Sequence, residues 1–311
     1  MKVLSLFDGM SCGMVALERV GIQVQNYFAS EIDKYAIQIS KKNYSNIIQL
    51  GNILNWHDWG QKWEQRSLSE IDLLIGGSPC QGFSVAGKHL NFKDPRSALF
   101  FKYVEILKWY KPKKFLLENV GRMDRKVRDK ISEILGVEPL RINSSLLSGQ
   151  NRDRYYWTDI EGVEQPEDKG IVMKDILDTD LVYERGHGCT KAGVKQLKKM
   201  RPLMKQSANN IYPEAKCKIV GTADLNGHDI LKRVYSTSGK SPTLTAVCGG
   251  NQEKKIAVDE KYWRKLTPLE CERLQTLPDN YTEGVSNTQR YKMIGNGWTV
   301  DVIAHIFKGL L

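Results

Sequence analysis

The first 160 residues alternate between short apolar runs and stretches with helical spacing. The apolar runs lie at 3–7, 27–30, 71–75 and 114–117, and the candidate helices lie at 14–20, 33–42 and 97–110. Such alternation predicts a parallel sheet covered by helices on both faces. Ligands in that architecture bind at the carboxyl ends of the strands. Each apolar run here leads into glycine or polar residues, as a ligand site at that edge requires.

From about Glu161 the alternation stops. An acidic, proline-containing stretch at 161–168 leads into a basic segment and then into polar, glycine-rich sequence up to about Gly250. We expect a second, smaller domain that is rich in loops. An apolar amphipathic helix is expected over 298–310.

Basic residues outnumber acidic ones by 46 to 36, which gives a net charge of +10. The stretch from Arg185 to Lys218 contains nine of these basic residues and one acid, Glu214. A segment with this charge indicates a polyanionic partner such as nucleic acid. A solvated helix face is the alternative explanation.

Several classes of protein are excluded. No apolar run is long enough to span a membrane, and the N-terminal run breaks at Asp8, too early for a signal peptide. We therefore expect an intracellular, cytoplasmic protein with no membrane partner. The six cysteines form no Cys-x-x-Cys unit and the five histidines no His-Glu-x-x-His unit. Reduced thiols and no metal site follow from this spacing.

The first predicted strand runs into a glycine-containing turn over 7–13, and Glu31 follows the second strand. A turn of this kind lets a ligand approach the backbone, and an acid after the second strand can accept hydrogen bonds from ribose hydroxyls. The turn lacks the Gly-x-Gly-x-x-Gly spacing of a dinucleotide site, so a single nucleoside is the better fit. An ordinary turn with a surface glutamate explains this segment equally well.

The stretch Gly76-Gly77-Ser78-Pro79-Cys80-Gln81-Gly82-Phe83-Ser84 puts a cysteine on a rigid turn after the third strand. Its glycines permit close approach of a substrate, and Pro79 restricts the backbone before the thiol. A nucleophilic cysteine needs partial exposure and a lowered pKa. A lone cysteine is more often a small buried group. The other motifs of the chain favour the nucleophile.

Five motifs occur in order: Pro79-Cys80-Gln81, Glu118-Asn119-Val120, Gln150-x-Arg152-x-Arg154, Arg264-Lys265-Leu266-Thr267-Pro268-x-Glu270-Cys271 and Gly295-Asn296. Together they resemble the S-adenosylmethionine-dependent DNA (cytosine-5) methyltransferases of the bacterial and phage type, the enzymes of restriction-modification systems. The resemblance extends over almost the whole chain. It implies an α/β fold, with a Rossmann-like methyltransferase catalytic domain and a smaller, loop-rich target-recognition domain.

The resemblance also implies a mechanism, in which a cytosine flipped out of a specific short duplex sequence receives a methyl group at carbon 5. Cys80 adds to carbon 6 as a thiolate, and Glu118 protonates the ring at its N3 edge. Partial burial of Glu118 favours the protonated form that this role needs. Arg152 holds the base and neutralises developing charge, and Arg154 supports the same surface.

S-adenosylmethionine is the implied cofactor and S-adenosylhomocysteine its product. The implied cofactor contacts are Phe7, Gly9, Met10, Ser11, Glu31, Ile32, Asn52, Pro79, Leu99, Asn296 and Trp298. This chain departs from the family pattern at three places. Ser11-Cys12 replace two glycines, Asn52 replaces an aspartate that contacts adenine, and Gly297-Trp298 replace a more usual Ser-Val.

We expect a catalytic domain over 1–165, a target-recognition domain over 166–283, and a C-terminal segment over 284–311 that completes the catalytic domain. The implied partner is double-stranded DNA, bound by a monomer. The implied DNA contacts are Gln81, Ser84, Gln150, Gly227, His228, Asp229, Arg233 and Tyr235. An ordinary solvent loop is an equal alternative for any one side chain of the 226–229 loop.

Other classes fit less well. A P-loop before Gly239-Lys240-Ser241 needs a glycine where Val234 stands, and a nicotinamide dehydrogenase has no use for Cys80. An RNA cytosine-5 methyltransferase is the closest competitor, and the long segment between 161 and 250 favours DNA. A catalytically silent DNA-binding relative stays open, although Cys80, Glu118 and Arg152 are all retained.

Overall fold

The computed structural model describes residues 1–62, 68, 70–79, 98–179, 201–205, 217–247 and 249–311. The chain forms two compact units. Unit 1 comprises Met1–Asn143, Asp153–Pro166 and Val300–Leu311, and unit 2 comprises Ser144–Arg152 and Glu167–Thr299. The units assign 284–299 to unit 2, whereas the expected C-terminal segment joined them to the catalytic domain. Compactness describes packing alone, so the expected functional division stays a prediction.

Unit 1 is built around one mixed sheet, which in the described residues has the strand order β3-β2-β1-β4-β5-β8-β6. The strands are β1 (Lys2–Leu6), β2 (Asn26–Ser30), β3 (Ile48–Gln49), β4 (Leu73–Gly76), β5 (Lys114–Val120), β6 (Leu140–Asn143) and β8 (Asp153–Thr158). Strands β3 to β5 pair in parallel, while β8 runs antiparallel to both β5 and β6. This sheet confirms the α/β, Rossmann-like fold expected from the alternating pattern.

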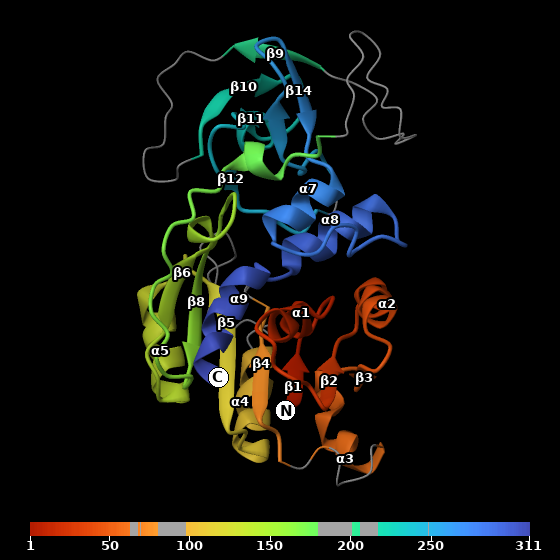
Figure 1. Cartoon of the computed structure of the whole chain (residues 1–311), viewed down its shortest axis with the longest axis vertical. Helices are drawn as coiled ribbons and strands as arrows, with labels where there is room; N and C mark the ends of the chain where they lie inside the picture. Colours follow the sequence, from red (N-terminus) through yellow and green to blue (C-terminus); the bar gives the residue numbers. More distant parts are fainter. Residues whose placement is uncertain (63–67, 69, 80–97, 180–200, 206–216, 248) are drawn as a thin grey trace. The chain divides into compact units, whose positions relative to one another are not determined.

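The helices of unit 1 are α1 (Cys12–Arg19), α2 (Lys34–Asn43), α3 (Trp59–Lys62), α4 (Ala98–Tyr110), α5 (Arg125–Leu135) and α9 (Val300–Phe307), with 3-10 turns η1 (Ile53–Asp58) and η8 (Lys308–Leu310). The chain moves from β1 outward to β2 and β3, then returns to β4 and moves the other way to β5. Because parallel crossovers are right-handed, α1 and α4 cover opposite faces. The C-terminal helix α9 packs beside α1 (Figure 1).

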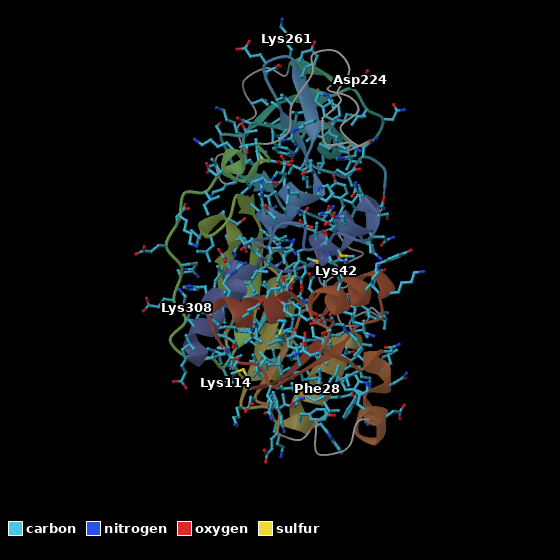
Figure 2. The ribbon with its side chains drawn as sticks, turned by 45° about the vertical axis from the view of Figure 1, so that its right-hand side comes forward. Phe28, Lys42, Lys114, Asp224, Lys261 and Lys308 are labelled. Atoms are coloured by element: carbon cyan, nitrogen blue, oxygen red, sulfur yellow. The ribbon has the colours of Figure 1, made fainter. Side chains whose placement is uncertain are left out.

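The core of unit 1 explains why its strands read as continuous apolar runs. Leu4, Leu6, Phe28 and Leu74 are fully buried between the helical layers, and Figure 2 labels Phe28 in its strand. Strands covered on both faces lose the alternation of a half-exposed strand. Helix α2 begins where the sequence indicates, because the Asp33 carboxylate accepts from the backbone N–H of Tyr35 at 2.9 Å.

Unit 2 is more regular than the loop-rich domain that the sequence predicts. Its described strands β9 (Arg201–Lys205), β10 (Ile219–Ala223), β11 (Arg233–Tyr235), β13 (Lys255–Ala257) and β14 (Tyr262–Lys265) close into a barrel. The remaining described elements are η5 (Ser144–Leu146), β7 (Gln150–Asn151), η6 (Met173–Ile176), α6 (Asp229–Lys232), β12 (Ser241–Pro242), α7 (Pro268–Leu274) and α8 (Asn287–Asn296). Among the described helices of the whole chain, none is long and apolar enough to cross a membrane.

Candidate active site

The parallel strands of unit 1 bring the predicted site residues of that unit to one edge. Strands β1 to β5 run in the same direction, so the segments that follow them all emerge at the carboxyl end of the sheet (Figure 1). These segments carry Phe7, Glu31, Asn52 and Pro79, and Glu118 lies near the end of β5. The chain reverses its direction of travel between β1 and β4, which is where ligands bind in open α/β sheets.

The turn after β1 has an unusual backbone. Phe7, Gly9 and Ser11 have φ angles of 57°, 61° and 64°, in the left-handed region that residues other than glycine seldom adopt. The Asp8 N–H donates to the Ser30 carbonyl at 3.1 Å, which ties the turn to the end of β2. A Cβ added to Gly9 meets no heavy atom within 4 Å, so the turn leaves open space at this residue.

Glu31 is fixed beside this turn by three backbone donors. One carboxylate oxygen accepts from the Gly9 N–H at 2.8 Å, and the other accepts from the N–H groups of Ile32 and Asp33 at 2.7 and 2.8 Å. Two carboxylate oxygens offer about four acceptor positions, so capacity remains for ligand hydroxyls. The neighbouring Ile32 side chain is 72% exposed, an apolar surface next to a fixed acid. This pair fits the ribose and adenine of a nucleoside cofactor.

Met10 and Ser11 are two of the predicted cofactor contacts, and their roles stay predictions. Both are buried, at 1% and 0% exposure, so neither presents a surface to a cofactor in this structure. The Ser11 hydroxyl is instead bonded within the protein, donating to the Asp8 carboxylate at 2.6 Å and lying 2.6 Å from the Ser40 hydroxyl. Asp8 itself was not among the predicted site residues. Its neighbourhood of hydroxyls comes from residues distant in the sequence, so no local pattern identifies it.

The remaining cofactor candidates of unit 1 lie around this edge. Asn52 accepts from the Leu54 N–H at 3.0 Å and so caps η1, with one lone pair of its Oδ1 used in this bond. Pro79 is half-buried at the end of the described part of its segment. Phe7 and Leu99 are partly buried and pack against the core of unit 1. Asn296 and Trp298 belong to unit 2, so their part in cofactor binding stays a prediction.

Glu118 and Arg154 form an ion pair on adjacent strands. The Arg154 Nε lies 2.7 Å from Glu118 Oε1, and the two side chains are 14% and 12% exposed. Strands β5 and β8 pair so that Val120 lies opposite Arg154, two residues beyond Glu118. The carboxyl group is therefore partly buried, as predicted, and it also has a permanent cationic partner, which the sequence did not indicate.

Asn119 connects this strand end to the segment that leads to Cys80. Its side-chain amide is buried and donates to the carbonyl and the hydroxyl of Ser78, at 3.3 and 3.2 Å. Ser78 is two residues before Cys80, so the start of that segment is fixed against β5. The predicted residues Cys80, Gln81 and Ser84 lie outside the described residues.

Arg152 has a different environment from Arg154. It is buried in unit 2, and its guanidinium donates to the carbonyls of Leu244 at 2.9 Å, Gly295 at 3.3 Å and Gly297 at 2.9 Å. A Cβ on Gly295 would lie 2.2 Å from the Thr245 carbonyl oxygen, so this glycine is required for the close approach. The described contacts of Arg152 thus join the loop at Leu244 to the C-terminal end of helix α8, whereas the sequence predicts a contact with the base.

Two of the predicted DNA contacts are buried. Gln150 has no exposed surface, and its amide bonds to Leu274, Gln275 and Leu244 within unit 2. Tyr235 is 6% exposed and lies in β11 of the barrel, where burial raises the pKa of its hydroxyl. The part of both residues in DNA binding stays a prediction. Both predictions came from their positions in motifs, which do not reveal burial.

The predicted base-reading loop is accessible. Gly227, His228 and Asp229 are exposed, and Gly227 has a φ of 125°. The His228 ring accepts from the Ile230 N–H at 3.3 Å and caps the short helix α6. Arg233 is partly buried at the start of β11. These positions are compatible with DNA contacts by the loop, which stay a prediction.

Unit 2 also contains buried charges that sequence reasoning did not single out. Lys240 is 3% exposed and donates to the carbonyls of Ser145 at 2.6 Å, Ser148 at 3.1 Å and Ile171 at 2.5 Å. Arg264 forms a buried bidentate pair with Glu270, which also caps α7. Lys240 thereby holds the segment that precedes Gln150 and Arg152.

Comparison with known proteins agrees with this geometry. The family model described as C-5 cytosine-specific DNA methylase matches residues 1–136 and 148–311. The orphan methyltransferase M.SPRI of Bacillus phage SPR is 29% identical over 432 residues, covering 100% of this chain and 97% of that protein. The type II methyltransferase M.HhaI of Haemophilus parahaemolyticus is 28% identical over 332 residues, covering 98% and 93%.

Solved structures show the same fold. The Entamoeba histolytica methyltransferase EhMeth superposes with a TM-score of 0.67 at 16% identity, covering 100% of this chain and 99% of that one. At this identity the likeness concerns the fold alone. The family model carries the assignment, because it matches nearly every residue and includes the Glu118 and Arg154 segments. This chain therefore belongs to the C-5 cytosine-specific DNA methylase family, whose members are S-adenosylmethionine-dependent methyltransferases.

Proposed function

We propose that this protein methylates carbon 5 of a flipped cytosine in a short duplex DNA sequence, with Cys80 as the nucleophile and S-adenosylmethionine as the cofactor. The observation that carries the proposal is the Glu118–Arg154 ion pair, next to the Asn119 contact that anchors Ser78. An acid, a cation and the start of the Cys80 segment thus meet at one strand end. That combination suits an addition reaction on a polar ring.

Cys80 and Glu118 have separate roles in the proposed methyl transfer. The Cys80 thiolate forms a bond to carbon 6 while N3 gains a proton at the Glu118 side, which makes carbon 5 electron-rich. When bound, the cofactor supplies an electrophilic methyl group. Once carbon 5 carries the methyl group, a base removes the carbon 5 proton and N3 returns its proton to Glu118. The bond between Cys80 and carbon 6 breaks as the double bond between carbons 5 and 6 forms again. Glu118 acts here as a general acid, a role that contributes roughly 10²–10⁴-fold in rate.

The structure favours Arg154, rather than Arg152, as the arginine that contacts the substrate. Arg154 is the guanidinium beside Glu118, so we propose that it contacts the target base or its phosphate and stabilises charge there. Arg152 is committed to three carbonyls, and we propose that it acts as a brace for unit 2. A buried guanidinium whose two terminal nitrogens already donate to backbone carbonyls is poorly placed to bind a base.

Cofactor binding is proposed for the turn of unit 1. Glu31 accepts the ribose hydroxyls, Ile32 packs on the adenine, and Gly9 provides the open approach at the methionine end. Asn52 offers a side-chain amide to the adenine edge. Phe7, Pro79 and Leu99 complete the apolar walls.

Duplex DNA is the proposed partner, read by the exposed loop at Gly227–Asp229 of unit 2. Its phosphates attract the basic excess of the chain. We propose a monomer that acts in the cytoplasm, on nucleoid or phage DNA.

The test is transfer of labelled methyl groups to pooled duplex DNA of random sequence and, in parallel, to transfer RNA, followed by cytosine conversion sequencing. Label in DNA at one short sequence supports the proposal. Label in RNA alone overturns the substrate, and label in neither leaves a silent DNA-binding protein.

A further inference from the structure

The side-chain amide of Gln275 uses its full hydrogen-bonding capacity inside unit 2. Its oxygen accepts from the Thr299 hydroxyl at 2.8 Å and from the Gln150 amide at 3.1 Å. Its nitrogen donates to the carbonyls of Ile294 at 2.8 Å and Gly297 at 3.1 Å. An amide has two donor hydrogens and two acceptor lone pairs, so every position is used. Gln275 has no exposed surface, and these bonds fix its orientation.

Two of these bonds belong to a closed ring of hydrogen bonds. The Thr299 hydroxyl, which donates to Gln275, accepts from the Ser144 hydroxyl at 2.9 Å. The Gly297 carbonyl, which accepts from Gln275, also accepts from the Arg152 guanidinium at 2.9 Å. The Ser144 N–H donates to the Arg152 carbonyl at 2.9 Å and closes the ring. The members of this Gln275 ring are Ser144, Arg152, Gln275, Gly297 and Thr299, and its side chains are at most 4% exposed.

Three elements of unit 1 begin or end next to a residue of the Gln275 ring. Strand β6 ends directly before Ser144, strand β8 begins directly after Arg152, and helix α9 begins directly after Thr299. At each of these points the chain passes from one unit to the other. The points are far apart in the sequence, and the hydrogen bonds of the ring join them. The ring therefore fixes the ends of these elements with respect to one another.

The end of β8 that adjoins the ring contains Arg154. This residue lies opposite Val120 in the last pair of the β5–β8 ladder, and one residue separates it from Arg152. The ends of strands fray, because a terminal residue has ladder partners on one side only. An anchor at Arg152 opposes this fraying. The Arg154 Nε lies 2.7 Å from the Glu118 carboxylate, a position that a frayed strand end would not keep.

We infer that Gln275 is a positioning residue for the methyl transfer, because through the ring it holds the end of β8 so that Arg154 stays beside Glu118. The inference rests on the proposed function, in which Arg154 contacts the substrate. Misplacing such a group by about 1 Å lowers a rate by roughly 100-fold. DNA affinity depends on many contacts besides Arg154. Damage to the ring should therefore lower kcat and leave the KM for DNA nearly unchanged.

The experiment compares variants of the full chain at matched buried positions. Gln275→Met removes the amide and keeps an unbranched side chain of similar length. Thr299→Val replaces the ring hydroxyl with a methyl group, and Thr299→Ser retains the hydroxyl. The control is Thr282→Val, because Thr282 is a buried threonine of unit 2 whose hydroxyl donates to Glu272, outside the ring. Urea denaturation and steady-state kinetics with duplex DNA are measured for each variant.

Thr299→Val is expected to lower kcat roughly tenfold and Gln275→Met roughly 100-fold, with the KM for DNA within about twofold of wild type. Thr299→Ser should keep kcat within about twofold of wild type. Thr282→Val should lower the denaturation midpoint about as much as Thr299→Val while its kcat is unchanged. If Gln275→Met does not fold, the two threonine positions decide the question. A wild-type kcat in Thr299→Val overturns the inference, and so does an equal loss of kcat in Thr282→Val.

Hydrogen exchange of the backbone amides gives a readout that needs no substrate. Exchange at the start of β8 should be faster in Thr299→Val than in wild type, and unchanged in Thr282→Val. Unchanged exchange at β8 in Thr299→Val overturns the inference, whether or not the protein methylates DNA. Faster exchange, together with a wild-type protein that methylates no nucleic acid, supports the hold of the ring on β8 and contradicts the proposed function.

Discussion

The Arg154 Nε lies 2.7 Å from Glu118 Oε1, across the antiparallel contact of β5 and β8. Both side chains are largely buried, so the carboxyl has a fixed orientation at the edge where the strands end. A buried pair is strongly sensitive to loss of either member, because the remaining charge is left uncompensated. We therefore expect Glu118 and Arg154 to act together in the proposed reaction, so that loss of either side chain impairs the other.

Glu118→Gln should therefore reduce kcat by roughly 10²–10³-fold, because the amide cannot donate a proton to the ring. The amide keeps the size of the side chain, so DNA and cofactor affinity should change little. Steady-state kinetics with a DNA substrate that contains the target sequence measure both parameters. A kcat within about twofold of wild type would exclude Glu118 as the acid.

Cys80→Ala should abolish methyl transfer while cofactor binding is retained, since no bond to carbon 6 can form. A second measurement uses duplex DNA with 5-fluorocytosine at the target position. Fluorine does not leave as a proton does, so the wild type should be trapped on the DNA and migrate as a covalent complex in a denaturing gel. Turnover by Cys80→Ala, or an active wild type that is never trapped, contradicts the Cys80 route.

The arrangement of the strand edge could be predicted from the sequence, and the reason is physical. Apolar runs that alternate with helices form strands that pair in parallel, and the residues after parallel strands meet at one edge. This places Glu31 and Glu118 correctly. The partners of buried polar groups could not be predicted, because they depend on tertiary contacts. Asp8 with Tyr27, and Asn119 with Ser78, are pairs of this kind.

Unit 2 was harder to predict for a related reason. Its barrel strands are short, between three and five residues in β10, β11 and β13, and long connections separate them. Short strands carry too few residues for a period of two to be visible. Tyr235 is buried in this barrel and Gln150 beside it in β7 of unit 2, a burial that motif positions alone do not reveal; their part in DNA binding stays a prediction.

The hydrogen bonds of Arg152 predict an effect of this residue on the free energy of unfolding. Arg152→Ala leaves three carbonyls of unit 2 without their donor, and we expect it to lower the free energy of unfolding by about 2–4 kcal/mol. Arg141→Ala is the control, because Arg141 is an exposed arginine whose bonds to Asp153 lie at the surface. Its loss should lower the free energy of unfolding by less than about 1 kcal/mol.

Chemical denaturation of both variants measures this difference, and kinetics separate the two arginines of the motif. Arg152→Ala should retain more of the wild-type kcat than Arg154→Ala under conditions where both are folded. The opposite order, with a stable Arg152→Ala protein that has lost activity, would restore Arg152 as the residue that holds the base.

The raised pKa of Asp8 predicts how stability depends on pH. Burial raises this pKa from 3.8 to about 6, so the folded state binds the proton more tightly than the unfolded state does. The stability that this proton contributes is fully present below the unfolded pKa and is lost as the pH rises through 6. The difference between the two pKa values corresponds to a loss on the order of 3 kcal/mol.

Asp8→Asn stays neutral and does not lose this contribution. Its free energy of unfolding, relative to wild type, should therefore increase between about pH 4 and pH 6 and stay constant above that range. Urea denaturation of both proteins across this range, without cofactor, measures the difference. Parallel curves for the two proteins would mean that Asp8 has an ordinary pKa. A difference that increases over this range indicates that the turn after β1, Phe7 to Ser11, keeps a buried carboxylate at a cost in stability, as functional sites often do.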